Sequence, residues 1–120
     1  MNNLYEQEIR YKLLKILAKE SHIGQRELAR KMGISLGKVN YCLTELAKRG
    51  LIKVNRFKSA RNKIPYTYIL TVNGLEEKAR LTVNFLKRKV REYEEIKRQI
   101  SELEKEVDEN RLAEAEKLRS

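Results

Sequence analysis

Residues 35–48 place hydrogen-bonding side chains between apolar residues that recur at helical spacing. The apolar face of the expected helix consists of Val39, Leu43 and Leu46. The side chains expected to point outward, or to lie along the helix start, are Ser35, Leu36, Gly37, Lys38, Asn40, Tyr41 and Thr44. An asparagine amide can pair with an adenine edge, a lysine reaches guanine or phosphate, and a leucine or threonine contacts a thymine methyl. These residue types favour contact with a DNA groove over the alternative, the solvated face of an ordinary helical core.

Two further helices are expected to position this segment. An amphipathic helix covers residues 3–19, and a short second helix covers residues 25–32. Gly33 tolerates the positive φ at which a helix often ends, and Ser35 can cap the next helix through its side-chain oxygen. The second and third helices, joined by a turn of about three residues, therefore match a helix-turn-helix.

The start of the second helix offers another possible contact. Gln25 and Arg26 combine polar side chains with the free N–H groups of a helix N-terminus, an arrangement that often binds phosphate. They are candidates for the DNA backbone, and the equal alternative is that both are simply solvated.

After Gly50 the pattern changes to a β-type run over residues 51–54, and later Ile64, Tyr66, Tyr68 and Leu70 occupy alternate positions, which predicts two strands. The loop between them, residues 55–64, is expected to form a wing. It carries basic residues and no acidic one. Candidates for the minor groove or its flanking phosphates are Lys58, Arg61, Asn62 and Lys63. The alternative is a hairpin tip that charge keeps soluble.

The net charge of +10 comes from one part of the chain. Residues 1–71 hold 15 Lys and Arg against 5 Asp and Glu, whereas residues 72–120 hold 12 of each. A compact domain with such an excess attracts polyanions, and an anionic membrane surface would be attracted as well. The balanced remainder is typical of a solvated helix with internal ion pairs.

A long helix is expected from about Val72 to near the C-terminus, with Thr71 as its cap. Within it, apolar residues at spacings of three and four form a heptad seam: Tyr93, Ile96, Ile100, Leu103 and Val107. β-branched residues at one core position with leucine at the other favour two parallel strands. Asn110 takes the next core position, so we expect a homodimer whose helices fray after about residue 110.

Composition excludes several classes of protein. With 41% hydrophobic and 37% charged residues the chain is expected to be globular and soluble, and no apolar run approaches the roughly 20 residues of a membrane span. The N-terminus does not resemble a signal peptide, which predicts a cytoplasmic protein. Cys42 and His22 are the only residues of their types, so neither a metal site nor a disulfide is expected. No catalytic set or cofactor motif is present, and Cys42 is expected to be an inert core residue.

Residues 6 to about 104 resemble the MarR-type winged-helix regulators, most closely the small sub-group associated with exopolysaccharide gene clusters. The matching segments are Arg10–Leu14, Gln25–Ala29, Gly33–Leu43, Asn62–Lys63 with Tyr66 and Tyr68, Glu77–Ala79 and Phe85–Lys89. The resemblance implies a recognition helix at residues 35–48, a wing at 55–64 and a regulatory role, with polysaccharide synthesis as the implied target.

The sequence also departs from that family. A typical member dimerises through helices from both termini, which frame a small-molecule pocket, and this chain offers one long C-terminal helix instead. The wing also lacks the usual Asp-x-Arg. We therefore expect dimerisation through the last helix and no pocket for a phenolic effector.

These expectations combine into one prediction for the fold. It is mainly α with a small β-wing, in which a winged helix-turn-helix DNA-binding domain over residues 1–72 precedes a dimerisation helix over residues 73–120. The expected function is that of a homodimeric transcriptional regulator of double-stranded DNA. The alternatives are an architectural DNA-binding protein without sequence preference and a winged-helix module that binds proteins.

Overall fold

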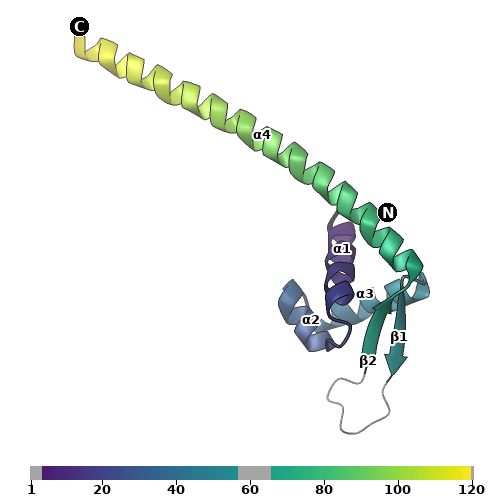
Figure 1. The fold of residues 1–120 in the computed structure, drawn as a ribbon. Coiled ribbons are helices and arrows are strands. Elements are labelled where there is room, and N and C mark those ends of the chain that lie inside the picture. The colour runs from purple at the N-terminus through teal and green to yellow at the C-terminus, as the bar shows by residue number, and fades with distance from the viewer. Residues whose placement is uncertain (1–3, 57–65, 120) are drawn as a thin grey trace. The chain divides into compact units, whose positions relative to one another are not determined.

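The computed structural model of the protein describes residues 4–56 and 66–119 (Figure 1). Its elements, in chain order, are α1 (Leu4–Lys19), α2 (Gln25–Met32), α3 (Leu36–Lys48), β1 (Ile52–Arg56), β2 (Tyr66–Leu70) and α4 (Val72–Arg119). The expected class is confirmed, because a two-stranded wing follows the helix-turn-helix and a long helix completes the chain.

The turn between α2 and α3 forms as the residue types predict. Gly33 ends α2 in the left-handed conformation, at φ 65°. The Ser35 hydroxyl oxygen then accepts a hydrogen bond from the backbone N–H of Lys38, 3.1 Å away, and so caps α3. Gly50 adopts φ 70° just after the helix. These local choices fix the directions of α2 and α3 before any long-range packing is considered.

A core of aliphatic side chains holds the three helices and the hairpin together. The largest fully buried side chains are Leu13, Leu14, Leu17, Leu28 and Val39. Helix α2 packs on α3, α1 on β2, and α3 on β1. Removing such side chains from water is the main stabilising contribution, at about 25 cal/mol per Å² of apolar surface. The face of α3 opposite this core is thereby turned outward.

Strands β1 and β2 pair antiparallel, with Ile52 opposite Leu70 at one end and Arg56 opposite Tyr66 at the other. The inward residues of β2 do not strictly alternate, because Thr67 and Tyr68 are both buried. Two-stranded ribbons twist strongly, so neighbouring residues need not divide into an inner and an outer face. The wing residues Lys58, Arg61, Asn62 and Lys63 lie outside the described residues.

The first turns of α4 belong to the same compact unit as the helix-turn-helix. The Thr71 hydroxyl caps α4 as predicted, accepting from the N–H of Gly74 at 3.1 Å, and it donates to the carbonyl of Gly50 at 2.6 Å. Leu81 is buried in the core. The compact unit consequently spans Met1–Val83, and a second unit comprises Asn84–Ser120. The division into residues 1–72 and 73–120 stays a prediction.

The second unit is an exposed stretch of α4 whose charges pair along the helix. Lys89 bonds Glu92 at 3.1 Å, and Arg98 pairs with Glu95 and Glu102. Ion pairs of this spacing stabilise a solvated helix, as the balanced charge predicts. The helix continues to Arg119, beyond the predicted fraying point near residue 110. Within residues 4–56 and 66–119, no helix combines the length and the apolar composition that crossing a membrane requires.

Candidate nucleic-acid interface

Helix α3 divides into the two faces that its sequence predicts. Val39, Leu43 and Leu46 are buried. On the other side Leu36 is 43% exposed and Tyr41 57% exposed. Exposed around them are Ser35, Gly37, Asn40 and Thr44, while Lys38 is half-buried. The structure therefore exposes six of the seven residues predicted here and places the seventh, Lys38, at the edge toward α1. We call these seven residues the α3 face.

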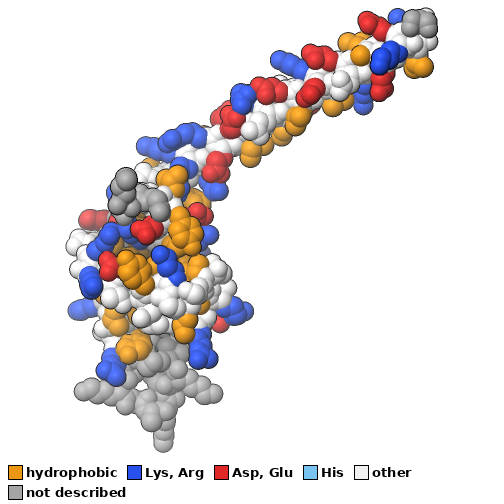
Figure 2. Space-filling model, turned by 180° about the vertical axis from the view of Figure 1, so that it is seen from behind, with side chains coloured by type: hydrophobic (Ala, Val, Ile, Leu, Met, Phe, Trp, Pro, Cys, Tyr) orange, Lys and Arg blue, Asp and Glu red, His pale blue; other side chains and the backbone are white. Residues whose placement is uncertain are grey.

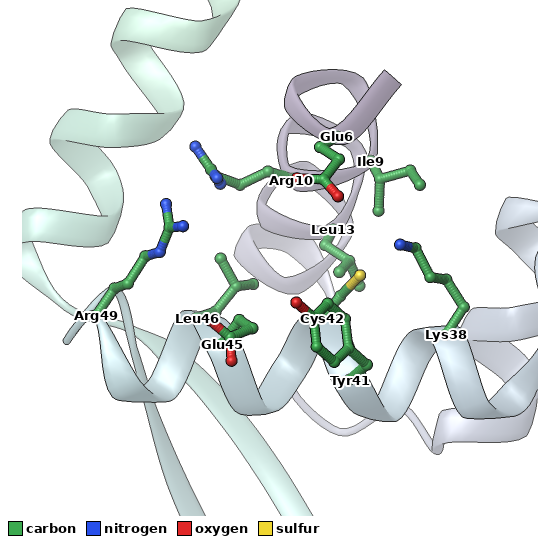
Figure 3. A pocket seen from close by; sticks show the side chains of 10 residues that line it. All are labelled: Glu6, Ile9, Arg10, Leu13, Lys38, Tyr41, Cys42, Glu45, Leu46 and Arg49. Atoms are coloured by element: carbon green, nitrogen blue, oxygen red, sulfur yellow. The ribbon is translucent and has the colours of Figure 1, made fainter. Parts of the chain in front are cut away.

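Lys38 and Tyr41 form a pair on the α3 face. The Lys38 ammonium lies 5.3 Å from the centre of the Tyr41 ring, a cation–π distance (Figure 3). This contact orients the lysine without neutralising its charge. A positive charge is thereby held near the Tyr41 ring, and the ammonium and the phenolic hydroxyl can each donate a hydrogen bond to a phosphate or a base.

Asn40 is oriented by a contact that sequence reasoning missed. The Gln25 amide nitrogen lies 3.5 Å from the Asn40 side-chain oxygen and 3.1 Å from the Tyr68 hydroxyl oxygen, donating to both. Tyr68 is itself buried, so this network links α2, α3 and β2. The three residues are far apart in the sequence, and no local signal predicts their meeting. Gln25, predicted as a contact to the DNA backbone, thus has a structural role at the α3 face.

Thr44 directs its hydroxyl proton toward the helix backbone. Its Oγ1 donates to the carbonyl oxygen of Asn40, one turn earlier, at 2.8 Å. Threonines inside helices often bond in this way. The hydroxyl proton is thus already engaged, which agrees with a contact through the methyl group better than with a donated hydrogen bond.

The start of α2 lies near the α3 face through Gln25, and Arg26 beside it is exposed. The residue before the helix is Gly24, which provides no side-chain cap for the first N–H groups. The predicted combination of a free helix N-terminus with an exposed arginine is therefore present.

A small cavity separates the α3 face from α1 (Figure 3). Its lining residues are Glu6, Ile9, Arg10, Leu13, Lys38, Tyr41, Cys42, Glu45, Leu46 and Arg49. The cavity volume is about 60 Å³. Pockets for drug-sized ligands are roughly 300–1,000 Å³, so this cavity has room for a few water molecules only.

Burial raises the pKa of the Cys42 thiol above its ordinary value, and the nearby Lys38 charge offsets only part of that effect. Because the thiolate is the reactive form, we expect Cys42 in the folded protein to react more slowly with iodoacetamide near pH 8 than an unstructured cysteine does. The rate should rise at a higher pH than for a free thiol. Mass spectrometry of the alkylated chain, with the urea-unfolded protein as control, measures this. Equal rates in both states would contradict the assignment.

No group of three or more His, Cys, Asp or Glu side chains that would hold a metal ion occurs in the described parts of the chain. Among the seven residues of the α3 face, the charged one is Lys38. The site therefore offers hydrogen-bond donors, a positive charge and a convex helix surface, which suit recognition of an anionic polymer.

Comparison with known proteins supports that interpretation. Residues 6–53 match a family of winged helix-turn-helix DNA-binding domains. The regulator PcaV from Streptomyces coelicolor has a similar structure, with 25% identity and a TM-score of 0.57 over 66% of this chain and 57% of PcaV. A comparison with curated protein sequences found no match.

Two other solved structures have the same fold. A MarR family protein from Mycobacterium tuberculosis, in complex with salicylic acid, has 21% identity and a TM-score of 0.54 over 79% of this chain and 75% of that protein. FabT from Streptococcus pneumoniae, in complex with DNA, has 21% identity and a TM-score of 0.53 over 76% of this chain and 59% of FabT.

The chain spans little more than half the length of PcaV and of FabT. The proteins it matches are DNA-binding proteins and transcriptional regulators, in agreement with the prediction that it is not an enzyme. Residues 6–53 thus match a family of winged helix-turn-helix DNA-binding domains, and the fold of the chain is similar, at low sequence identity, to that of a MarR-family protein.

Proposed function

We propose that this protein is a transcriptional regulator that binds a specific, roughly two-fold symmetric DNA operator as a homodimer. The observation that carries the proposal is the α3 face, where Asn40 and Lys38 are presented on a helix-turn-helix with a basic excess. In this motif the second helix enters the major groove and its first residues contact base edges.

Each residue of the α3 face has a role in this proposal. The Asn40 amide nitrogen remains available to donate while Gln25 holds its oxygen, and a modest rotation would let both atoms meet an adenine edge. Lys38 reaches guanine or phosphate, and Tyr41 bonds a phosphate. Leu36 and Thr44 contact thymine methyls, Gly37 allows close approach of the backbone, and Ser35 lies at the helix start.

Contacts outside α3 would fix the position of the domain on the duplex. Arg26 at the start of α2 would bind the DNA backbone, with Gln25 beside it. The wing residues Lys58, Arg61, Asn62 and Lys63 would follow the minor groove or its phosphates. Such contacts supply affinity that falls with salt, while the α3 face supplies sequence preference.

The homodimer would form through the seam of α4, whose members are Tyr93, Ile96, Ile100, Leu103 and Val107. Two copies would present two α3 helices to half-sites spaced ~34 Å, or a multiple of that, from centre to centre. Genes of polysaccharide synthesis are the proposed target, on the resemblance of the α3 segment to the exopolysaccharide-associated sub-group. The proposal includes no phenolic effector, because one long C-terminal helix stands in place of the helices from both termini that frame such a pocket in a typical member of the resembled family.

Asn40→Ala is expected to reduce the preference for the operator over random DNA by about 1–3 kcal/mol, because a bidentate contact to one base is lost. Lys38→Ala should weaken binding to all sequences and lower the salt dependence. The measurement is a salt titration of the intact protein against a pool of genomic fragments that includes its own upstream region.

Lys105→Ala is the matched control, since it removes one exposed positive charge from the second unit and changes no residue of the α3 face. Gln25→Ala should reproduce part of the Asn40→Ala effect, because it frees the Asn40 side chain. If all fragments bind alike and only salt matters, the protein is an architectural DNA-binding protein. If it oligomerises without binding DNA at moderate salt, the winged helix serves protein interaction instead.

A further inference from the structure

We propose that α4 pairs with α4 of a second copy in a parallel, in-register coiled coil, and that two kinds of interchain ion pair, Glu92 with Lys97 and Glu106 with Arg111, select this orientation. The inference rests on the proposed homodimer and specifies how its two chains recognise each other. Its evidence lies entirely within the unit Asn84–Ser120.

The apolar stripe on this unit is longer than the five-residue seam that the sequence predicts. Leu86 lies seven residues before Tyr93 and extends the same core position by one heptad, while Val90 flanks it. Each of these residues and of the seam residues is 50–61% exposed. In Figure 2, hydrophobic side chains follow one edge of the long helix, with charged side chains around them. Three heptads of exposed apolar surface reach the length at which a coiled coil becomes a specific expectation.

The first heptad contains one charged core residue, Lys89. Its ammonium bonds Glu92 in the same helix at 3.1 Å and lies 5.2 Å from the centre of the Phe85 ring. The lysine is therefore held toward the side of the helix rather than across the seam. Such a polar core position lowers stability and restricts the pairings that the helix accepts.

Charges on the outer surface of the helix are already paired within the chain. Arg98 bonds both Glu95 and Glu102 there. By contrast, no ion pair within the described part of α4 uses Lys97, Glu106 or Arg111, which flank the seam. The Lys97 ammonium instead lies 5.8 Å from the centre of the Tyr93 ring, next to the core. These three charges are thus available to a second helix, whereas Glu92 would share its carboxylate between Lys89 of its own helix and Lys97 of the second copy.

Tyr93, Ile100 and Val107 occupy the same core position of successive heptads. In a parallel coiled coil, the residue just before this core position faces the residue five positions later on the partner helix. This places Glu92 opposite Lys97 and Glu106 opposite Arg111, each twice by symmetry. The intervening pair is Gln99 with Glu104. Every charged pair is attractive and none is repulsive, so the in-register parallel arrangement is electrically complementary.

Antiparallel arrangements are less complementary. The alignment that places Ile100 opposite Leu103 retains only the attraction between Lys97 and Glu104. A shift of one heptad in one direction sets Glu92 against Glu106 and Lys97 against its own copy. A shift in the other direction sets Glu106 and Glu104 each against its own copy. Like charges at these positions disfavour an alignment, so the charge pattern selects against two of the three antiparallel alternatives.

Cysteine cross-linking in the full-length chain tests the orientation. In a Cys42→Ala background, Asn110→Cys should form a disulfide-linked dimer under mild oxidation, because parallel pairing puts the two cysteines at facing core positions. In the antiparallel alignment with Ile100 opposite Leu103, residue 110 faces Tyr93 instead. The Asn110→Cys and Tyr93→Cys chains are also mixed and oxidised together. If disulfides form only between one variant and the other, the pairing is antiparallel and the proposal is overturned.

Charge exchange tests the ion pairs. Lys97→Glu should raise the dimer dissociation constant on the order of tenfold, measured by sedimentation equilibrium at low salt. The double change Glu92→Lys with Lys97→Glu should restore dimerisation, because the parallel pair is then reversed rather than broken. Lys105→Glu, at an outward position, makes the same charge change and should leave the constant unaltered.

Two further outcomes would refute the parallel coiled coil. A monomer at all concentrations, or a double variant as weak as Lys97→Glu alone, would overturn the proposal. Circular dichroism of each variant shows whether the helix is retained. A parallel dimer that lacks sequence preference for DNA would leave this inference intact while refuting the proposed function, so the two failures are distinguishable.

Discussion

Gly74→Ala is expected to lower the free energy of unfolding by roughly 1–3 kcal/mol. Helix propensity alone would predict the opposite, because alanine is a better helix former than glycine. A Cβ atom at this position would lie 2.0 Å from the carbonyl oxygen of Leu51 and 3.0 Å from its carbonyl carbon. That oxygen also accepts a hydrogen bond from the N–H of Thr71 at 3.1 Å. Backbone lies on both sides of the contact, so relief requires the first turn of α4 to move away from Leu51, the residue before β1.

The matched control is Asn73→Ala, which adds the same helix-favouring residue at the neighbouring exposed position of the first turn. Urea unfolding of both variants, followed by circular dichroism, gives the comparison. Asn73→Ala should be neutral or slightly stabilising. If Gly74→Ala unfolds at the same urea concentration as Asn73→Ala, the first turn of α4 does not pack closely on the Leu51 backbone.

Glu77→Met is expected to cost about 2 kcal/mol of stability, because it removes the carboxylate that faces a buried guanidinium. Arg10 is only 8% exposed and contacts Glu77 at 3.4 Å across the α1–α4 interface. Breaking a fully buried ion pair by removing one partner costs roughly 3–5 kcal/mol. The expected value is lower because Glu77 and Arg10 each have a further interaction.

A double-mutant cycle separates pairing from packing. Arg10→Met should cost less than Glu77→Met, since Glu77 retains Arg80 at 2.6 Å and is nearer to solvent. The double variant Arg10→Met with Glu77→Met should return to within about 1 kcal/mol of the original protein, because no buried charge is left without its partner. Strictly additive losses would mean that the ion pair does not couple α1 to α4.

Much of the helix-turn-helix follows from short-range rules in the sequence. The bounds of α2, the left-handed Gly33 and the Ser35 cap are all set by residues within one helical turn. The inward residues of α3 follow from apolar spacing in the same way. For this reason the outward members of the α3 face could be predicted as a group, although their individual DNA contacts remain predictions.

The contacts between distant segments could not be predicted. Arg10 is buried against Glu77, 67 positions away, and the amphipathic pattern of the first helix does not indicate this contact. For Gln25 a contact with the DNA backbone and simple solvation were equal alternatives, and neither indicates its bonds to Asn40 and Tyr68. Nothing in the sequence around Gly74 indicates its close contact with Leu51. Each depends on where α4 and β2 pack, which local residue preferences do not encode.

The sequence by itself determined the order and type of the elements, the two faces of α3 and the apolar seam of α4, because helical periodicity and capping act over a few residues. Only the tertiary structure decided that the first turns of α4 complete the core of the DNA-binding unit. It also decided which polar side chains orient the α3 face. Those outcomes depend on burial and on hydrogen bonds between residues that meet only when the chain has folded.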